Sequence, residues 1–169
     1  MKGFRKNWRT KREMKRKVIN LNSKIRWIDG KSLPSEELKK IAQIDNNIPK
    51  EFDPHWKPNK DKNDRRIKYY KKLTDKDFFQ VLYCESEICG FHIIRDTGNS
   101  IAYISTLWVD PRFRNLGLGK KLKEKGLNWA KDSGFKFLHT SVQSKNVRMN
   151  EINQKNGFEI FSSTYRLTL

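Results

Sequence analysis

The chain has 169 residues, of which 37 are Lys or Arg and 19 are Asp or Glu, giving a formal net charge of +18. This length predicts one domain that buries roughly two-thirds of the surface its unfolded chain exposes. No apolar run approaches the roughly 20 residues of a membrane span, and no apolar signal-peptide core follows the N-terminus. These observations argue against a membrane-spanning or secreted protein, and we expect a cytoplasmic one.

The positive charge is concentrated at the N-terminus. Residues 1–31 contain twelve Lys or Arg against two acidic residues, and Phe4, Trp8 and Met14 lie among the basic residues of the extension formed by residues 1–23. This mixture favours contact with the phosphates and bases of RNA, in a ribosome or elsewhere, or with another polyanion. An acidic membrane surface and a solvated tail without a partner are the alternatives that these residues leave open.

The first part of the chain beyond this extension predicts a short strand followed by two helices. The strand is expected over 25–28 and an amphipathic helix over 35–45. Residues 46–64 contain three prolines and many Asn and Asp, which predicts a loop. The second helix is expected over 64–73.

Three strands in meander order are predicted over 78–85, 88–95 and 100–109, because β-branched and aromatic residues fill these runs and turn residues separate them. Cys84 and Cys89 flank the first turn and can lie opposite each other. Reduced thiols are nevertheless the expectation for a cytoplasmic chain. No Cys/His cluster has metal-ligand spacing, so no metal is implied.

The last part of the chain predicts a strand–helix–strand crossover. A long helix is expected over 116–133, with Gly134 at its C′ position, and a strand over 135–142. A short helix over 147–155 and a C-terminal strand region over 158–168 complete the prediction. The crossover predicts one parallel strand pair inside a mostly antiparallel sheet.

A glycine-rich loop lies between the third meander strand and the long helix. Strand, glycine-rich turn and helix start are the layout of an anion site, because the first N–H groups of a helix have no partner within it and the helix dipole is positive there. Gly117 and Gly119 allow a bulky anion close to the backbone. Arg114 and Lys120 add charge at the two ends of the loop. A tight turn without a ligand is the alternative.

Four segments together resemble the GNAT superfamily of acetyl-CoA-dependent N-acetyltransferases. They are Leu107-Trp108-Val109-Asp110-Pro111, Arg114-x-x-Gly117-x-Gly119, Val142-x-x-x-Asn146 and Gly157-Phe158. The resemblance covers residues 24–169, matches only loosely over 46–77, and leaves 1–23 as an extension outside the domain. It implies an α+β fold with a mostly antiparallel, twisted sheet of six or seven strands, a splayed parallel pair and about four flanking helices.

The resemblance also implies where acetyl-CoA binds. Its pyrophosphate would lie on the loop, against Arg114, Asn115, Leu116, Gly117, Leu118, Gly119 and Lys120. Its pantetheine arm would pair with the strand formed by Leu107, Trp108 and Val109, and the Val109 N–H would polarise the thioester carbonyl. Asn146 would bond the pantetheine arm or cap the next helix, two roles that can coexist.

The positions where relatives carry a general acid or base hold unsuitable residues in this chain. Asn153 stands where many relatives have a tyrosine that protonates the departing thiolate, and an amide cannot act as an acid. Ser141, and Ser105 or Thr106, stand where relatives have a carboxylate.

Three residues are candidate substitutes. His139 lies two residues before Ser141 on a predicted strand, so the two are expected on one face. Imidazole titrates near neutrality and can take up a proton directly or through a water held by Ser141, although a histidine packed in the sheet is the alternative. Tyr165 lies in the C-terminal region, which borders the substrate cleft in this family.

The absence of an evident base favours an acceptor amine with a low pKa. At pH 7 about one lysine amine in 2,500 is neutral, against roughly one α-amine in seven, a difference of about 3.5 kcal/mol in the barrier. The net charge favours acidic substrates. We therefore expect direct attack on acetyl-CoA by an α-amine or by an amine on an acidic or nucleic-acid-linked substrate. The alternatives are a non-catalytic CoA-binding module that binds RNA or the ribosome through residues 1–23, and a small-molecule acetyltransferase.

Overall fold

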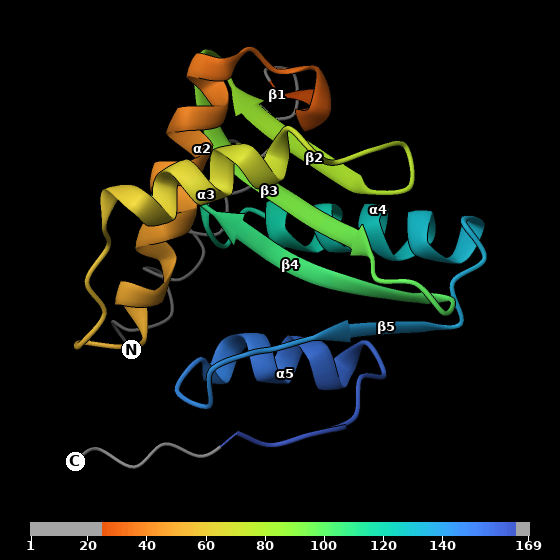
Figure 1. Ribbon diagram of the computed structural model, residues 1–169. Coiled ribbons are helices and arrows are strands. Elements are labelled where there is room, and N and C mark those ends of the chain that lie inside the picture. Colours follow the sequence, from red (N-terminus) through yellow and green to blue (C-terminus); the bar gives the residue numbers. More distant parts are fainter. Residues whose placement is uncertain (1–24, 165–169) are drawn as a thin grey trace, which may run out of the picture.

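The sheet consists of five strands that lie side by side in chain order (Figure 1). The computed structural model describes residues 25–164. The strands within them are β1 (Ile25–Asp29), β2 (Phe78–Cys84), β3 (Glu87–Asp96), β4 (Ile101–Val109) and β5 (Phe137–Thr140). Neighbours from β1 to β4 are antiparallel, whereas β4 and β5 are parallel. The expected α+β fold with a single parallel pair is confirmed for this part of the chain.

The strand region expected over 158–168 does not form a strand in the described residues. Residues 158–164 contain no helix or strand, and the remainder of the prediction lies outside the described range. Ile160 and Phe161 are each 84% exposed, so these two side chains are not buried in the core. The described sheet therefore has five strands, fewer than the expected six or seven.

The helices of the described residues have bounds close to those predicted from the sequence, with one exception. They are α2 (Ser35–Asn47), α3 (Lys60–Tyr70), α4 (Leu118–Asp132) and α5 (Val147–Lys155), with the short 3₁₀ helices η1 (Gly30–Ser32), η2 (Ile48–Glu51) and η3 (Pro111–Phe113). α3 begins four residues earlier than predicted, because the Asn59 side chain caps it by accepting the Lys62 N–H at 2.8 Å. No helix in residues 25–164 is long and apolar enough to cross a membrane.

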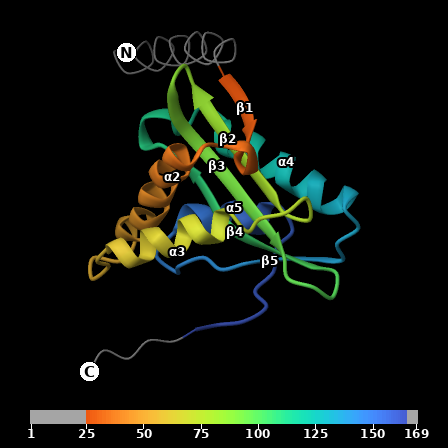
Figure 2. The same cartoon turned by 45° about the horizontal axis from the view of Figure 1, so that its top comes forward.

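Helices cover both faces of the sheet (Figures 1 and 2). α2 and α3 pack on one face and α4 on the other, while α5 lies at the β5 end. Side chains alternate along β2 in the usual way, so Val81 and Tyr83 contact the α2/α3 layer and Leu82 and Cys84 contact α4. The sheet thus has an apolar layer on each face.

The connection between α2 and α3, expected as an irregular loop, is held by buried polar contacts. The Asn46 side-chain amide donates to the Asn59 carbonyl at 2.9 Å and to Asn63 Oδ1 at 2.8 Å. Trp56 Nε1 donates to the Asn46 carbonyl at 2.7 Å, and Lys62 lies over the Trp56 ring. These contacts fix the connection against the start of α3.

Cys84 and Cys89 form a disulfide, so the expectation of two reduced thiols is wrong. The register of β2 and β3 explains the pairing. Leu82 is opposite Gly90 and Tyr83 is opposite Ile88, so Cys89 is the extra residue of a β-bulge. The bulge leaves Cys89 on the α4 face with Cys84, and their Cα atoms are 5.7 Å apart.

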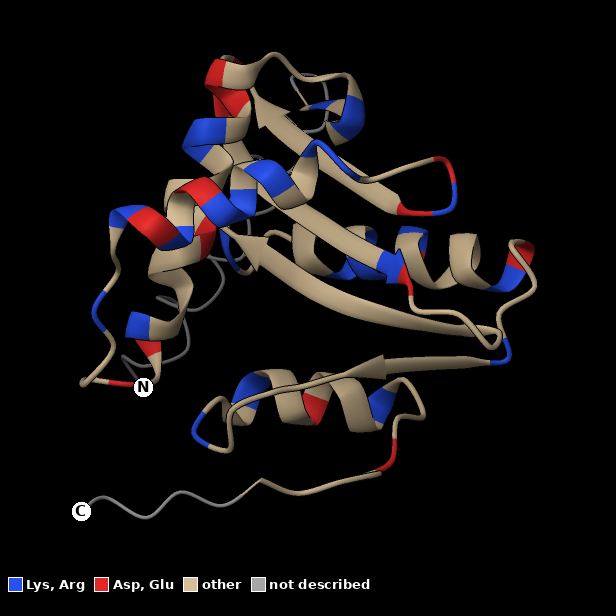
Figure 3. Cartoon of the chain, viewed as in Figure 1, with Lys and Arg blue, Asp and Glu red and all other residues tan. Residues whose placement is uncertain are grey.

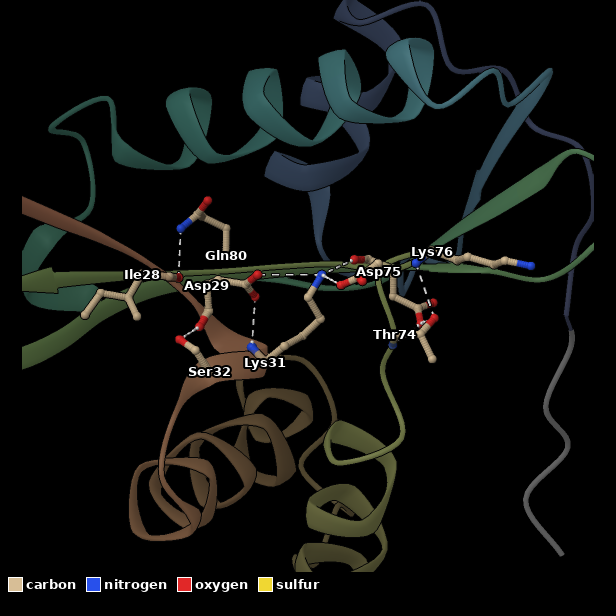
Figure 4. A network of polar contacts seen from close by, with 9 residues as sticks. Ile28, Asp29, Lys31, Ser32, Thr74, Asp75, Lys76 and Gln80 are labelled. Atoms are coloured by element: carbon tan, nitrogen blue, oxygen red, sulfur yellow. Dashed lines mark hydrogen bonds and ion pairs between the residues drawn. The ribbon is translucent and has the colours of Figure 1, made fainter.

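A polar network joins β1 to the loop that leads from α3 into β2 (Figure 4). Lys31 Nζ donates to the Asp77 carbonyl at 3.0 Å and pairs with Asp75 at 3.9 Å. Gln80 donates to the Ile28 carbonyl at 2.8 Å. The network anchors the outer edge strand, on the side of the sheet away from β5.

Candidate active site

The parallel strands separate halfway along β4. Their pairing runs from Ile101 opposite Phe137 to Ile104 opposite Thr140, whereas β4 continues to Val109. β5 ends at Thr140, and no other strand of residues 25–164 pairs with β4 along this edge. β4 therefore has an open backbone edge next to the glycine-rich loop.

A β-bulge lies where the two strands part. Ile93 is opposite Thr106 and Ile94 is opposite Ile104, so Ser105 has no residue opposite it on β3. A bulge bends the strand that contains it and increases its twist. The bend falls directly after the last residue that pairs with β5, and this is why the open edge begins at that position.

The direction of the backbone groups at the end of β4 follows from one hydrogen bond. The Asp110 N–H donates to the Cys89 carbonyl of β3 at 3.0 Å. Since successive residues of a strand direct their backbone groups to opposite edges, Val109 directs its N–H and C=O away from β3. Arg114 Nε donates to the Val109 carbonyl at 2.9 Å, in agreement with this direction. The Val109 N–H thus lies on the open edge.

The glycine-rich loop presents a row of free backbone donors. In the described part of the chain, no acceptor receives the N–H groups of residues 115–120. Asn115 and Gly117 have positive φ values of 64° and 81°, which turn the loop before α4 begins. A Cβ atom at Gly117 would meet nothing within 4 Å, so the space in front of the loop is open. Free N–H groups at a helix start form a site for an anion.

The two charged residues of the loop already have partners. Besides bonding Val109, Arg114 forms an ion pair with Glu51 of η2 at 2.7 Å. Lys120 is exposed and lies 3.5 Å from Glu124. The strands β4 and β5 themselves have no charged side chain (Figure 3). An anion on this loop would therefore be bound mainly by backbone N–H groups and the α4 dipole.

Two cavities meet at the open edge of β4. The larger cavity, of about 660 Å³, is lined by the end of β4, the loop from Phe113 to Lys120, and parts of α4 and α5. The smaller cavity, of about 260 Å³, lies between α2, α3, the middle of β4 and the residues after β5. The residues that line both cavities are Ile48, Phe52, Leu107, Lys123, Asn146 and Met149.

A buried carboxylate lies on the wall of the smaller cavity. Asp45 Oδ2 accepts hydrogen bonds from Arg66 Nε at 2.8 Å and from the Tyr70 hydroxyl at 2.7 Å. Its Oδ1 accepts the hydroxyl hydrogen of Thr106 at 3.0 Å. Burial, together with the Asp45 charge, raises the pKa of Tyr70, so this phenol stays protonated and donates.

Lys123 is the most unusual side chain of the site, and sequence analysis missed it. It is 3% exposed and donates to Asn153 Oδ1 of α5. Burial lowers its pKa to about 8. The signal was present in the sequence, because Lys123 precedes the buried Gly126 and Ala130 by three and seven residues and so falls on the buried face of α4.

The sequence model of the "Acetyltransferase (GNAT) family" matches residues 39–158, which is more than half of the chain. The chain belongs to this family. GNAT acetyltransferases transfer an acyl group from acetyl-CoA to an amine, and the protein is therefore an acyltransferase. No curated protein matches the chain.

Solved structures of other GNAT proteins share the fold. A protein of Pyrococcus furiosus assigned as an acetyltransferase is 24% identical, with a TM-score of 0.65 over 86% of this chain and 99% of that one. A GNAT-family protein of Staphylococcus aureus is 22% identical, with a TM-score of 0.58 over 70% and 99%. An aminoglycoside acetyltransferase from an uncultured soil metagenomic sample is 18% identical, with a TM-score of 0.62 over 88% and 99%. At these identities the likeness shows the fold alone.

The residues predicted to hold the cofactor lie together in the GNAT domain. Leu107, Trp108, Val109, Lys120 and all but two of the loop residues between Arg114 and Gly119 line the larger cavity. The two exceptions, Leu116 and Leu118, pack with the disulfide and Leu122 on the α4 face of the sheet. Asn146 accepts the Met149 N–H at 3.1 Å and so caps α5, while it also lines both cavities. The binding roles of these residues stay predictions.

The predicted catalytic residues are not brought to one place. Ser141 lines the smaller cavity and accepts the Tyr103 hydroxyl at 2.8 Å. His139 lines neither cavity and stacks on Phe161, with ring centroids 5.1 Å apart. Tyr165 lies outside the described residues. Within residues 25–164, no cluster of His, Cys, Asp or Glu has the geometry of a metal site.

Proposed function

We propose that this GNAT protein binds acetyl-CoA in the larger cavity and acetylates a primary amine that enters the smaller one by direct attack. The observation that carries the proposal is the meeting of the two cavities at Leu107 and Lys123, beside the open edge of β4. A donor and an acceptor that approach a strand edge from two sides can react there without a covalent enzyme intermediate.

The residues of the chain fit acetyl-CoA at both ends of the larger cavity. The free N–H groups of residues 115–120 would bind its pyrophosphate, and Gly117 leaves room for these oxygens. The open backbone of Leu107 and Val109 would pair with its pantetheine amides. Acetyl-CoA supplies an activated acetyl group, and the Val109 N–H would stabilise the negative charge that develops on the acetyl oxygen.

The acceptor would be an amine with a low pKa. Thr106 gives its hydroxyl hydrogen to Asp45, so its oxygen lone pairs are free to accept a hydrogen bond from an entering amine. The Asp45 carboxylate already accepts hydrogen bonds from Arg66, Tyr70 and Thr106, and we assign to it no role in removing a proton from the amine. An α-amine needs less help than a lysine side chain. The net charge of +18 further favours an amine on an acidic or nucleic-acid-linked substrate.

Titration calorimetry with acetyl-CoA tests donor binding, and thiol release during turnover tests transfer. Two peptides of one acidic sequence form the matched pair: one with a free α-amine and no lysine, the other with a blocked N-terminus and a single lysine. We expect micromolar donor binding and at least tenfold higher kcat/KM for the α-amine peptide. Equal or higher turnover of the lysine peptide would overturn the acceptor assignment, and absence of donor binding would overturn the whole proposal.

The extension formed by residues 1–23 would bring the substrate to the domain. Its interleaved basic and aromatic residues are suited to RNA or another polyanion. Removing these residues should raise KM for a nucleic-acid-linked amine and leave KM for a small free amine unchanged. An unchanged KM for both would contradict this role.

A further inference from the structure

We propose that Lys123 is the general acid of the transfer reaction and that its ammonium group protonates the sulfur of the departing CoA. This inference rests on the proposed function, because it requires acetyl-CoA to lie in the larger cavity. It assigns chemistry to a side chain of α4, whereas the sequence directed attention to β5 and the C-terminus.

The position of Lys123 supports this role. Lys123 lies on the first turns of α4, directly after the loop with the free N–H groups, and lines both cavities. Leu107, on the open edge of β4, lines the same two cavities. A thioester that extends from the loop along this edge brings its sulfur to the junction. Lys123 is therefore placed at the point where the bond to sulfur must break.

Lys123 has no carboxylate partner in the described part of the chain. Each carboxylate lining the cavities is already paired with another cation. The pairs are Asp45 with Arg66, Glu51 with Arg114, and Glu124 with Lys120. A lysine held by a buried ion pair keeps its proton tightly, whereas this one is free to give it up.

The contacts of Lys123 hold the amine in place without fixing its charge. Asn153 Oδ1 accepts one of its hydrogens, and the ring of Phe158 lies 4.7 Å from Nζ. The nearby His92 is fully buried and neutral at physiological pH, because burial lowers its pKa to about 4. Burial lowers the pKa of Lys123 to about 8, so the group can both donate and regain a proton near neutral pH.

A purely structural role does not account for a lysine at this position. The other buried residues of α4 are Leu118, Leu122, Gly126 and Ala130, all of them apolar or small. Lysine is among the residues most rarely buried without a charged partner, because its ammonium loses hydration. Leucine or methionine would fill the same space without this loss.

The proposed step is balanced in atoms and charge. The acceptor nitrogen forms a bond to the acetyl carbon as the bond from that carbon to sulfur breaks. Lys123 Nζ gives one proton to the sulfur, which leaves as the neutral thiol, and becomes a neutral amine. The acceptor nitrogen loses one proton to water, and Lys123 regains one from water. No oxidant or further reactant is needed.

The test uses the full chain with Lys123→Met, which keeps the length of the side chain and removes the proton. We expect kcat to fall by about 100-fold and the acetyl-CoA Kd to change less than threefold. The wild-type kcat should decrease above about pH 8, and this decrease should be absent in the variant. Lys123→Arg keeps the charge but does not release a proton near neutral pH, so it should be as slow as Lys123→Met.

A binding measurement tests the same contact without turnover. The Lys123 ammonium should lower the pKa of the bound CoA thiol by about one unit relative to Lys123→Met. The ultraviolet absorbance of the thiolate measures this pKa. The control is Lys125→Met on the same helix, because the Lys125 amine is exposed over the Trp27 ring. This variant should leave both kcat and the pKa of the bound CoA thiol unchanged. The assignment of Lys123 would be overturned, and the proposed function kept, if the wild type is active and the kcat of Lys123→Met or Lys123→Arg lies within threefold of it. An unshifted pKa of the bound CoA thiol would have the same meaning. Wild type without donor binding would instead overturn the proposed function as well.

Discussion

Thr106 of β4 donates its hydroxyl hydrogen to the Asp45 carboxylate of α2 at 3.0 Å. The two residues are 61 positions apart in the chain, and their contact places a carboxylate beside β4, which carries no acidic residue of its own. The polar wall of the smaller cavity is therefore assembled from α2, α3 and β4 together.

Breaking this contact should affect the acceptor and not the donor. In Thr106→Val the shape is kept and the hydroxyl is lost, so we expect kcat/KM for the amine to fall about tenfold, corresponding to one hydrogen bond of roughly 1.4 kcal/mol. The acetyl-CoA Kd, measured by calorimetry, should stay the same. A matching loss of donor affinity would show that Thr106 acts on the cofactor side.

Gly117 should be needed for donor binding because it leaves the space in front of the loop open, and not only because of its positive φ. Gly117→Glu places a carboxylate in front of the free N–H groups and should abolish acetyl-CoA binding in calorimetry. Gly98→Glu is the matched control, because Gly98 has a similar φ of 84° and equally open surroundings but lies in the β3–β4 turn. Both variants should lose about 1 kcal/mol of stability from the positive φ. Loss of binding in both would mean that the effect is structural.

His92 should make the folded state sensitive to acid. Complete burial lowers its pKa to about 4, against about 6.5 in the unfolded chain. Between these values the unfolded chain binds a proton that the folded chain does not, so stability should fall as pH decreases through this window, by up to about 3 kcal/mol. Denaturant unfolding of His92→Gln, compared with wild type at several pH values, should give a flatter curve over the same window. Parallel curves would contradict this account.

Lys123 should cost stability at neutral pH. Its folded pKa of about 8 lies below its unfolded value, so below pH 8 the folded chain carries a buried charge at a cost. Lys123→Met should therefore raise the free energy of unfolding at pH 7 by roughly 2 kcal/mol, allowing for solvent in the cavities. The gain should diminish from pH 8 to 10, as the folded wild type loses the proton. A variant less stable than wild type at pH 7 would contradict the prediction.

Local signals in the sequence were sufficient for the elements that position the donor site. The turn residues Gly98 and Gly134 both have positive φ values, and the Phe135 N–H bonds the Ala130 carbonyl, as a glycine C′ end of α4 requires. The β4–loop–α4 layout followed from the β-branched, apolar run of β4, the glycine spacing of the loop and the helical pattern after it. These features depend on residues close together in the chain, which is why sequence reasoning identified them.

Features that depend on distant residues were not predictable in the same way. The bulge at Cys89 depends on the register of two strands, and it decides whether the two cysteines meet. Asp45 belongs to the site only because α2 and β4 pack together. The helical spacing of Lys123 to Gly126 and Ala130 places it on the buried face of α4, but only the packing of α4 against β4 and α5 shows that it lines both cavities.

Arg114 connects the two cavities structurally. It ties the glycine-rich loop to Val109 and, through Glu51, to η2. η2 also contributes Ile48, whose side chain is part of the wall common to both cavities. A single guanidinium group thus connects the loop proposed to bind the phosphates with the wall that shapes the proposed acceptor pocket, so the geometry of each site depends on the other.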